Sequence, residues 1–286
     1  LPLGAAFAGN FLHRWLRWLG AAVSLTGAYS FYTSVSGRKQ PIMAVLPKSE
    51  SASLVVKIPA RGEVKHRVVL VAHTDTNRDR ITFSPKLKQF LRPMAFSVIS
   101  ALALNGAAQL FGWKKTRGMT TAYLGVAFGS FILDNVGPFV AGANDNASAI
   151  ACVLGLGGQL SQEPLENTEV WLAFTAAEEV GLLGMHTLLD NHREELADAY
   201  FIDFEMVGAG DIAYVTDHSG FTLFGNYQPD DESLALAVET AREHPELNVR
   251  GAPMTILEEV AALRSRGFRG LCIVGMGEDG WLKNWH

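Results

Sequence analysis

Several short stretches of this 286-residue chain carry acidic and histidine side chains whose spacing suits metal and proton chemistry. The first is His73-Thr74-Asp75, directly after an apolar run. Residues i and i+2 of an extended segment point to the same side. His73 could therefore bind a metal ion while Asp75 orients its imidazole ring. Taken alone, the pair is equally compatible with a surface position after a strand.

Two further stretches place carboxylates next to small residues. Asp145 lies in the sequence GANDNAS before a predicted helix, where the backbone can approach an ion closely, although a helix N-cap would also explain it. Glu178 and Glu179 follow an apolar strand. Adjacent side chains point in different directions, so one could bind a metal while the other moves a proton. A solvated acidic helix start is the alternative.

Asp203 and Glu205 lie two residues apart in an otherwise apolar segment, so both point to the same face. Burying two unpaired carboxylates would cost several kcal/mol, and a bound cation would remove that cost. His286 follows Trp285 at the end of the sequence and alone would indicate no function.

The segments between these residues alternate short β-branched runs with longer helical patterns. Strands are predicted at 54–58, 68–72, 169–174, 199–204, 212–216 and 271–275. Helices are predicted at 147–162, 181–191, 231–243 and 258–266. Several strands are apolar on both faces, which is typical of a sheet covered by helices. The alternation predicts an α/β fold with a doubly wound sheet and a site where the strands end.

In their order along the chain, these stretches resemble the co-catalytic di-zinc peptidase family, the clan MH zinc exopeptidases that include bacterial leucyl aminopeptidases and glutamate carboxypeptidase. The sequence GANDNAS followed by AFTAAEEVGLLG carries most of the resemblance, which covers roughly residues 50–286. It implies a three-layer α/β/α sandwich on a mixed, mostly parallel sheet.

The resemblance also implies a site with two Zn²⁺ ions bridged by Asp145. One ion would be held in addition by His73 and Glu205, and the other by Glu179 and His286. The family commonly has Asp where this chain has Glu205, so Asp203 remains an alternative ligand.

The resemblance further implies that Glu178 is the general base and that Asp75 orients His73. We therefore expect a zinc-dependent metallopeptidase acting on peptide substrates, most readily an aminopeptidase. Glu258 and Glu259, before a predicted helix, could bind a substrate amine. The alternatives are a carboxypeptidase or dipeptidase on the same scaffold, or a catalytically inactive, membrane-bound binding module.

The composition argues against a nucleic-acid partner, because 24 Lys and Arg against 29 Asp and Glu give a net charge of −5. Charged residues make up only 19% of the chain. Three apolar segments without any charge account for the deficit: 18–37, 93–113 and 118–133. The first two are long enough to span a bilayer, and the third becomes so if its helix continues past Asp134.

These segments suggest an organisation in three parts. We expect an N-terminal apolar helical segment over residues 1–37, a possible membrane span, and a peptidase domain over 38–286 that an apolar helical hairpin interrupts at 86–141. Residues 18–37 and 93–133 would contact membrane lipid and make the protein membrane-associated. Helices buried in a soluble protein are the alternative.

The orientation in the membrane stays open, because two sets of five basic residues favour opposite sides. The sets are Arg14, Arg17, Lys114, Lys115 and Arg117, and Arg38, Lys39, Lys86, Lys88 and Arg92.

Overall fold

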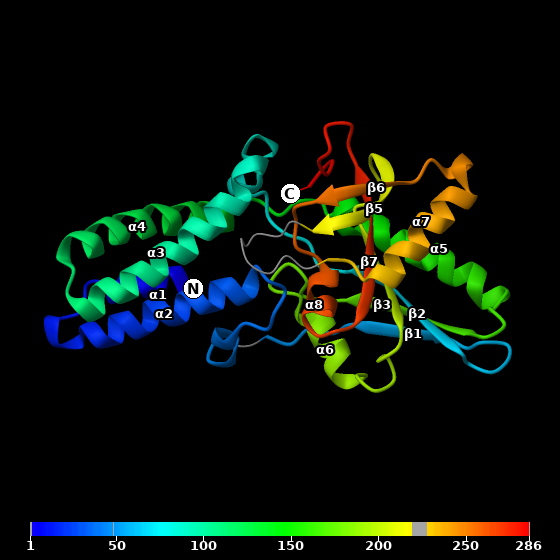
Figure 1. The fold of residues 1–286 in the computed structure, drawn as a ribbon, viewed down its shortest axis with the longest axis horizontal. Helices are drawn as coiled ribbons and strands as arrows, with labels where there is room; N and C mark the ends of the chain where they lie inside the picture. Colours follow the sequence, from blue (N-terminus) through cyan, green and yellow to red (C-terminus); the bar gives the residue numbers. More distant parts are fainter. Residues whose placement is uncertain (1, 48, 219–227, 286) are drawn as a thin grey trace. The chain divides into compact units, whose positions relative to one another are not determined.

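The computed structural model describes residues 2–47, 49–218 and 228–285, which form two compact units (Figure 1). The helical unit comprises the described parts of residues 1–48 and 78–139. The sheet unit comprises the described parts of residues 49–77, 140–220 and 226–286.

The sheet unit is built on a seven-stranded mixed sheet of order β1-β3-β2-β4-β7-β5-β6. Its strands are β1 (Leu54–Ile58), β2 (His66–His73), β3 (Thr168–Thr175), β4 (Tyr200–Glu205), β5 (Asp211–His218), β6 (Arg250–Met254) and β7 (Arg269–Met276). Strands β3, β2, β4 and β7 are parallel. Strand β1 is antiparallel to β3, and β5 is antiparallel to β7 but parallel to β6. The prediction of a mixed, mostly parallel sheet is therefore confirmed.

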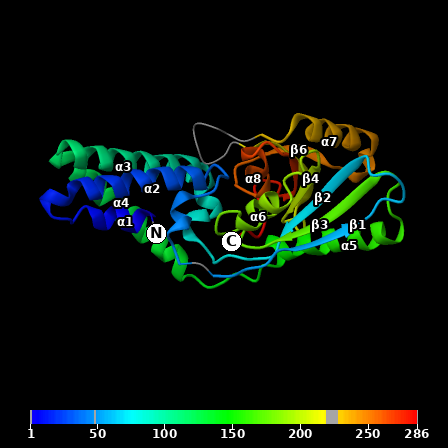
Figure 2. The same cartoon turned by 90° about the horizontal axis from the view of Figure 1, so that it is seen from below.

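Helices cover both faces of this sheet. They are α5 (Ser148–Gln162), α6 (Leu183–Asn191), α7 (Asp231–Glu243) and α8 (Glu259–Ser265). In Figure 1, α5 and α7 lie to the right of β7, while α6 and α8 lie to its left. The three-layer α/β/α sandwich is thus present, and Figure 2 shows the neighbouring strands β1, β2 and β3 of its sheet from a second direction.

The apolar runs of the central strands fill the space beneath α5. Leu70, Leu172 and Phe174 form one buried cluster with Ala149 and Val153 of α5. On the opposite face, Phe201 packs edge-to-face on Phe268, with ring centroids 6.0 Å apart. Because both faces are covered, the strands are apolar throughout until they reach the edge that carries the polar residues.

The strand register brings the chemically active residues to one edge of the sheet. His73, the last residue of β2, pairs with Thr175, the last residue of β3. Val71 pairs with Asp203, so β2 and β4 end level, at His73 and Glu205. Parallel strands present their carboxyl ends together, which is where a doubly wound sheet binds its ligands.

Gly184, at the start of α6, lies where no side chain fits. A Cβ atom there would lie 2.3 Å from the carbonyl oxygen of Ala176 and 2.6 Å from its nitrogen. Because backbone atoms cannot rotate away, we expect Gly184→Ala to lower the free energy of unfolding by about 1–3 kcal/mol. Chemical denaturation of the full chain measures the change.

Gly155→Ala in the middle of α5 is the matched control, because no atom lies within 4 Å of a Cβ at that position. There the substitution should raise the free energy of unfolding by up to about 1 kcal/mol, since Ala is the better helix former. Equal effects of the two substitutions would contradict the packing of α6 on Ala176.

The helical unit contains α1 (Pro2–Gly9), α2 (Arg17–Ser34), α3 (Leu91–Phe111) and α4 (Lys114–Val136). Short 3-10 turns accompany them at Arg14–Leu16, Pro41–Ala44, Ile81–Phe83 and Pro85–Phe90. Helices α3 and α4 form the predicted apolar hairpin, and α4 does continue past Asp134. Leu3, Ala28, Leu102 and Leu124 belong to the apolar core of this unit.

Among the described residues, one helical segment, Lys86–Phe111, is long and apolar enough to cross a membrane by length and composition. Helices α2 and α4, which cover most or all of the other two charge-free segments, do not meet this criterion. The most apolar window of Lys86–Phe111 has a mean hydropathy of 1.5, and 44% of that window is buried within the protein. The same length and composition also occur in core helices of soluble proteins.

Candidate metal centre

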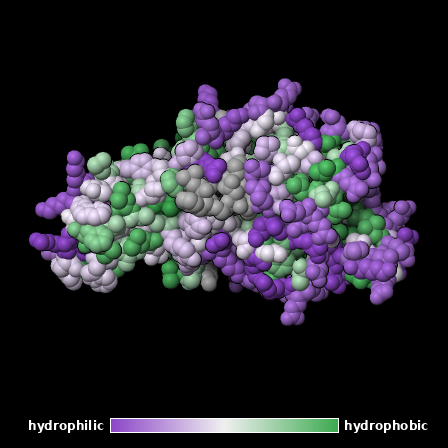
Figure 3. Space-filling model, viewed as in Figure 1, coloured by the Kyte–Doolittle hydropathy of each residue, from purple (hydrophilic) through white to green (hydrophobic). Residues whose placement is uncertain are grey.

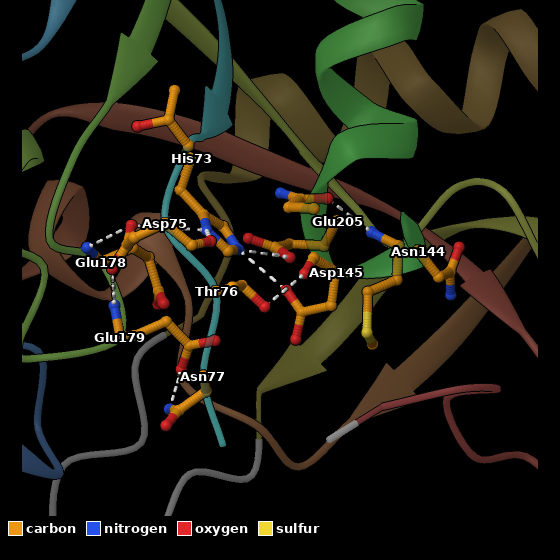
Figure 4. A network of polar contacts seen from close by, with 12 residues as sticks. His73, Asp75, Thr76, Asn77, Asn144, Asp145, Glu178, Glu179 and Glu205 are labelled. Carbon is orange, nitrogen blue, oxygen red and sulfur yellow. Dashed lines mark hydrogen bonds and ion pairs between the residues drawn. The ribbon is translucent and has the colours of Figure 1, made fainter. Parts of the chain in front are cut away.

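His73, Asp145 and Glu205 converge at the carboxyl edge of the sheet (Figure 4). The Nε2 atom of His73 lies 3.0 Å from Oδ1 of Asp145 and 3.6 Å from Oε2 of Glu205. One potential ligand atom from each residue lies within 4.8 Å of the other two, and the three residues are 1%, 5% and 3% exposed. Strand ends supply His73 and Glu205, and the loop before α5 supplies Asp145.

This cluster fits a cation. Nδ1 of His73 lies 3.0 Å from the carbonyl oxygen of Asp75, an acceptor for an Nδ1 proton. In that tautomer Nε2 presents a lone pair toward the two carboxylates, and Oε1 of Glu205 is buried without a hydrogen-bond partner. Burial raises the pKa of Glu205 to about 7, against the opposing influence of His73. A divalent ion among these oxygens and the nitrogen would relieve both the repulsion and the desolvation.

Asp75 lies between His73 and the Glu178–Glu179 loop and contacts both. Its Oδ1 accepts a hydrogen bond from the backbone N–H of Glu178 at 3.0 Å, and its Oδ2 accepts one from the N–H of Glu179 at 3.1 Å. Oδ1 also lies 3.6 Å from Nδ1 of His73. Burial alone would raise the pKa of Asp75, but the contacts with His73 and the two amides lower it. Nδ1 of His73 thus has the backbone carbonyl of Asp75 as its acceptor, while the Asp75 carboxylate holds the backbone of the Glu178–Glu179 loop.

Glu178 and Glu179 have different surroundings, as expected for adjacent side chains that point in different directions. Asn77 Nδ2 donates a hydrogen bond to Oε2 of Glu179. Glu178 is half-buried, and withdrawal from water together with the charges of Glu179, Glu205 and other carboxyls raises its pKa well above the usual range. Glu179 is not part of the three-residue cluster, and its predicted co-ligand His286 lies outside the described residues.

Asp203, the alternative ligand, lies in a different cluster. Its carboxylate is within 4.8 Å of ligand atoms of Glu258 and Cys272, all of them buried. Glu258 caps α8 by accepting a hydrogen bond from the N–H of Val260. Among the described residues, Glu205 rather than Asp203 therefore shares a cluster with His73 and Asp145.

Glu259, which we considered as a ligand for a substrate amine, is buried. It accepts a hydrogen bond from Oγ1 of Thr175, the residue that pairs with His73. Burial raises the pKa of Glu259 to about 8, against the opposing influence of the Thr175 hydrogen bond and the charge of His73.

Sequence reasoning overlooked the amide side chains that hold the Asp145 loop. Oδ1 of Asn146 accepts from the N–H of Met206 at 3.0 Å, and its Nδ2 donates to the carbonyl oxygen of Phe204 at 2.9 Å. Oδ1 of Asn144 accepts from the N–H of Gly208 at 3.0 Å. These bonds fix Asp145 against the end of β4. The signal was visible in GANDNAS, where asparagines flank the aspartate on both sides.

We expect Asp75→Asn to lower kcat by about 10–100-fold. The carboxylate of Asp75 accepts hydrogen bonds from two backbone N–H groups, and the NH₂ group of an asparagine would face one of them without being able to accept. The same change should weaken zinc affinity, since His73 would lose its neighbouring charge. Steady-state kinetics and competition with a zinc chelator measure the two effects. Unchanged values for both would show that Asp75 does not position the site.

Part of the sequence matches the profile of a known protein family, and the fold resembles known structures. Residues 121–261, which include Asp145, Glu178, Glu179 and Glu205, match the profile of Peptidase family M28. A search of curated protein sequences gives no match. LapB from Legionella pneumophila shares the fold, with a TM-score of 0.52 and 13% identity over 99% of this chain and 66% of LapB.

Two further solved structures align less closely. An Acidobacteriales bacterium glutaminyl cyclase has a TM-score of 0.49 and 15% identity over 80% of this chain and 61% of its own. BSAP, a zinc aminopeptidase from Bacillus subtilis, has a TM-score of 0.48 and 17% identity over 82% of this chain and 42% of its own. The chain therefore spans about two fifths to two thirds of the length of these structures.

The profile match over residues 121–261 confirms the resemblance to the co-catalytic zinc peptidases that the ordered motifs indicate, and the chain shares its fold with LapB.

Proposed function

We propose that this chain is a zinc-dependent metallopeptidase that removes residues from the N-terminus of peptides. The observation that carries the proposal is the buried convergence of His73, Asp145 and Glu205 beside a Glu178–Glu179 loop whose backbone Asp75 holds. Histidine nitrogens and carboxylate oxygens are the ligands that zinc takes in catalytic sites, and the predicted ligand His286 would add a second histidine.

The residues would divide the work as follows. Asp145 would bridge two ions, with His73 and Glu205 completing one coordination set and Glu179 and His286 the other. Zinc, when bound, polarises the scissile carbonyl group and lowers the pKa of water. Glu178 would accept the proton of the attacking water and deliver it to the leaving amine. Its raised pKa makes Glu178 a stronger proton acceptor than an ordinary carboxylate.

The charge of the site favours an aminopeptidase over a carboxypeptidase. The charged neighbours with the largest influence on the pKa of Glu178 are His73 and three carboxyl groups, those of Glu179, Glu205 and Glu259. With the ions bound, Glu179 and Glu205 would be neutralised as ligands, and Glu178 would remain as an uncoordinated carboxylate that attracts a free α-ammonium group. A carboxypeptidase, in contrast, needs a cation to receive the C-terminal carboxylate of its substrate.

A panel of four forms of one short peptide tests this assignment: free, N-acetylated, C-amidated and doubly blocked. Mass spectrometry of the products identifies the bond that is cut. We expect removal of the first residue from the free and C-amidated forms and a loss of roughly 100-fold or more in kcat/KM on N-acetylation, because the site's carboxylates would face no ammonium group.

The other outcomes identify the alternatives. Cleavage that C-amidation abolishes and N-acetylation does not would establish a carboxypeptidase on the same scaffold. Cleavage only of a peptide of two residues would establish a dipeptidase. No cleavage by a folded chain that also binds no zinc would establish an inactive binding module.

A further inference from the structure

The helical unit has a charge and hydropathy opposite to those of the sheet unit. Residues 1–48 and 78–139 hold 13 Lys and Arg against two acidic residues, Asp79 and Asp134. The remainder of the chain holds 11 Lys and Arg against 27 Asp and Glu. Figure 3 shows hydrophilic side chains crowding the sheet unit, whereas apolar and weakly polar ones dominate the visible face of the helical bundle. A basic, apolar unit suits a membrane that carries anionic lipids.

Besides its apolar core, the bundle buries a network of polar side chains, while many large apolar side chains lie on its outside. Oδ1 of Asn105 accepts hydrogen bonds from Ser24 Oγ at 3.0 Å and Gln109 Nε2 at 2.8 Å, and its Nδ2 donates to Thr120 Oγ1 at 2.8 Å. All four residues are buried. Large apolar side chains are exposed instead, among them Trp18, Leu25, Tyr29, Leu104, Leu110, Met119, Val126, Ile132, Leu133 and Val136. In water this distribution would be unfavourable, but it is the arrangement found between helices in lipid.

The lengths of α3 and α4 match the thickness of a bilayer, and α3 lies in the one described helical segment that is also apolar enough for a span. Helix α3 has 21 residues and α4 has 23, which at about 1.5 Å per residue give roughly 31 and 34 Å. The hydrocarbon core of a bilayer is about 30 Å thick.

One end of the bundle has the composition of a lipid headgroup region. The α1–α2 and α3–α4 turns meet there, because a Cβ on Gly112 would lie 3.2 Å from a guanidinium nitrogen of Arg17. The turns carry three exposed tryptophans and five basic residues: Trp15, Trp18, Trp113, Arg14, Arg17, Lys114, Lys115 and Arg117. Tryptophan and basic side chains are enriched at the level of the headgroups.

A groove of about 660 Å³ opens between α1 and α4 at this same end. Its walls are apolar, with Phe7 and Phe11 on one side and Ala122, Gly125 and Val126 on the other. The volume is within the range of about 300–1,000 Å³ found for small-molecule sites. Phe11 and Val126 are each 72% exposed, so the groove faces outward from the bundle.

Arg117 stands at the polar end of the groove, beside Asn10 and Thr121. Residues 1–49 and 80–133 contain no Asp or Glu, so these segments provide no carboxylate to neutralise its guanidinium group. Asn10 is already engaged, because its Oδ1 accepts from Asn105 Nδ2 at 3.0 Å. The half-buried Arg117 therefore offers a cationic fork to a ligand with a phosphate.

We propose that the helical unit lies in a lipid bilayer and that the α1–α4 groove binds one anionic phospholipid. The phosphate would lie on Arg117, and an acyl chain would lie against Phe7, Gly125 and Val126. The basic turns around Arg117 would favour a lipid with net negative charge over a zwitterionic one.

Native mass spectrometry of the full chain, released from nanodiscs of phosphatidylglycerol or of phosphatidylcholine, tests the groove. The wild type should retain one phosphatidylglycerol about tenfold more strongly than phosphatidylcholine, because one charge-assisted contact is worth about that factor. Arg117→Gln should remove this preference. Ala122→Phe, which fills the groove, should abolish retention of either lipid. Arg14→Gln, which removes an equal charge from the same end outside the groove, should retain the wild-type preference.

Three results would overturn the proposal. Equal loss of preference in Arg117→Gln and Arg14→Gln would indicate unspecific surface charge. A crosslinked dimer that Ala122→Phe disrupts without altering lipid retention would identify a second copy of the chain as the occupant. Release of the chain from cell membranes by a carbonate wash would exclude integration in the bilayer. The hydrolysis expected of the sheet unit should survive in all three variants and serves as the check on folding.

Discussion

Glu178→Gln is expected to lower kcat by about 10²–10⁴-fold, the contribution typical of a general base. Glutamine keeps the shape of the side chain but cannot accept the proton of water. The backbone N–H of Glu178 that Asp75 holds is not altered by the substitution. His73, Asp145 and Glu205 also keep their positions, so the zinc content should stay that of the wild type.

Glu163→Gln is the matched control, because Glu163 is an exposed residue just after α5 and removal of its charge should leave kcat unchanged. Zinc analysis and steady-state kinetics on the three proteins measure the effects. If Glu178→Gln turned over substrate at the wild-type rate with a full complement of zinc, another group would have to be the base.

The second large effect is expected from metal removal. Without a cation, the oxygens of Asp145 and Glu205 lie around His73 in a buried space, where unneutralised carboxylates are costly. Zinc at about 1,000 times its dissociation constant should therefore raise the free energy of unfolding by about 4 kcal/mol. Exhaustive chelation should remove this stabilisation together with all hydrolysis.

Asp145→Ala should reproduce both losses, because Asp145 is the predicted bridge between two ions. Its zinc content should fall from two per chain to one or none, and added zinc should no longer raise the unfolding temperature to the wild-type value. Asp217→Ala, which removes a carboxylate from β5 that is not among these residues, is the control and should keep the zinc response. A chain whose stability zinc does not change, in wild type and control alike, would contradict the centre.

The elements with strong local signals were predictable from the sequence. Helix α7 spans Asp231–Glu243 as predicted, because Asp230 accepts a hydrogen bond from the N–H of Ser233 and caps it. The central strands β2, β3, β4 and β7 were also predicted, because continuous apolar runs are typical of strands in a sheet that helices cover on both faces.

The missed elements have weak local signals. Strand β6 contains Gly251 and Pro253, both poor strand residues, and lies at the edge of the sheet, where proline is tolerated. The helical segment predicted over residues 1–37 is divided into α1 and α2, a break that was not predicted, and α1 with its eight residues is stabilised by packing, as the burial of Leu3 and Ala6 shows.

Within the candidate site, residue types could be predicted but not the contacts between distant segments. The hydrogen bonds from the amides of Glu178 and Glu179 to Asp75 join residues more than 100 positions apart. The alternation of side chains along a strand also could not predict that Asp203 and Glu205 belong to different clusters. Both side chains point to one face, but the presence of Glu258 and Cys272 beside Asp203 depends on how β7 and α8 pack there.

The central claim is that zinc at this centre makes the chain a peptidase, and a zinc titration tests it most directly. The full chain is stripped with a chelator, and the hydrolysis rate of a leucine anilide is followed as Zn²⁺ is returned in steps. The account predicts no activity in the stripped chain and a rate that rises to a plateau at two equivalents. No hydrolysis at any zinc content in a folded, zinc-loaded chain, or a rate independent of zinc, would contradict it.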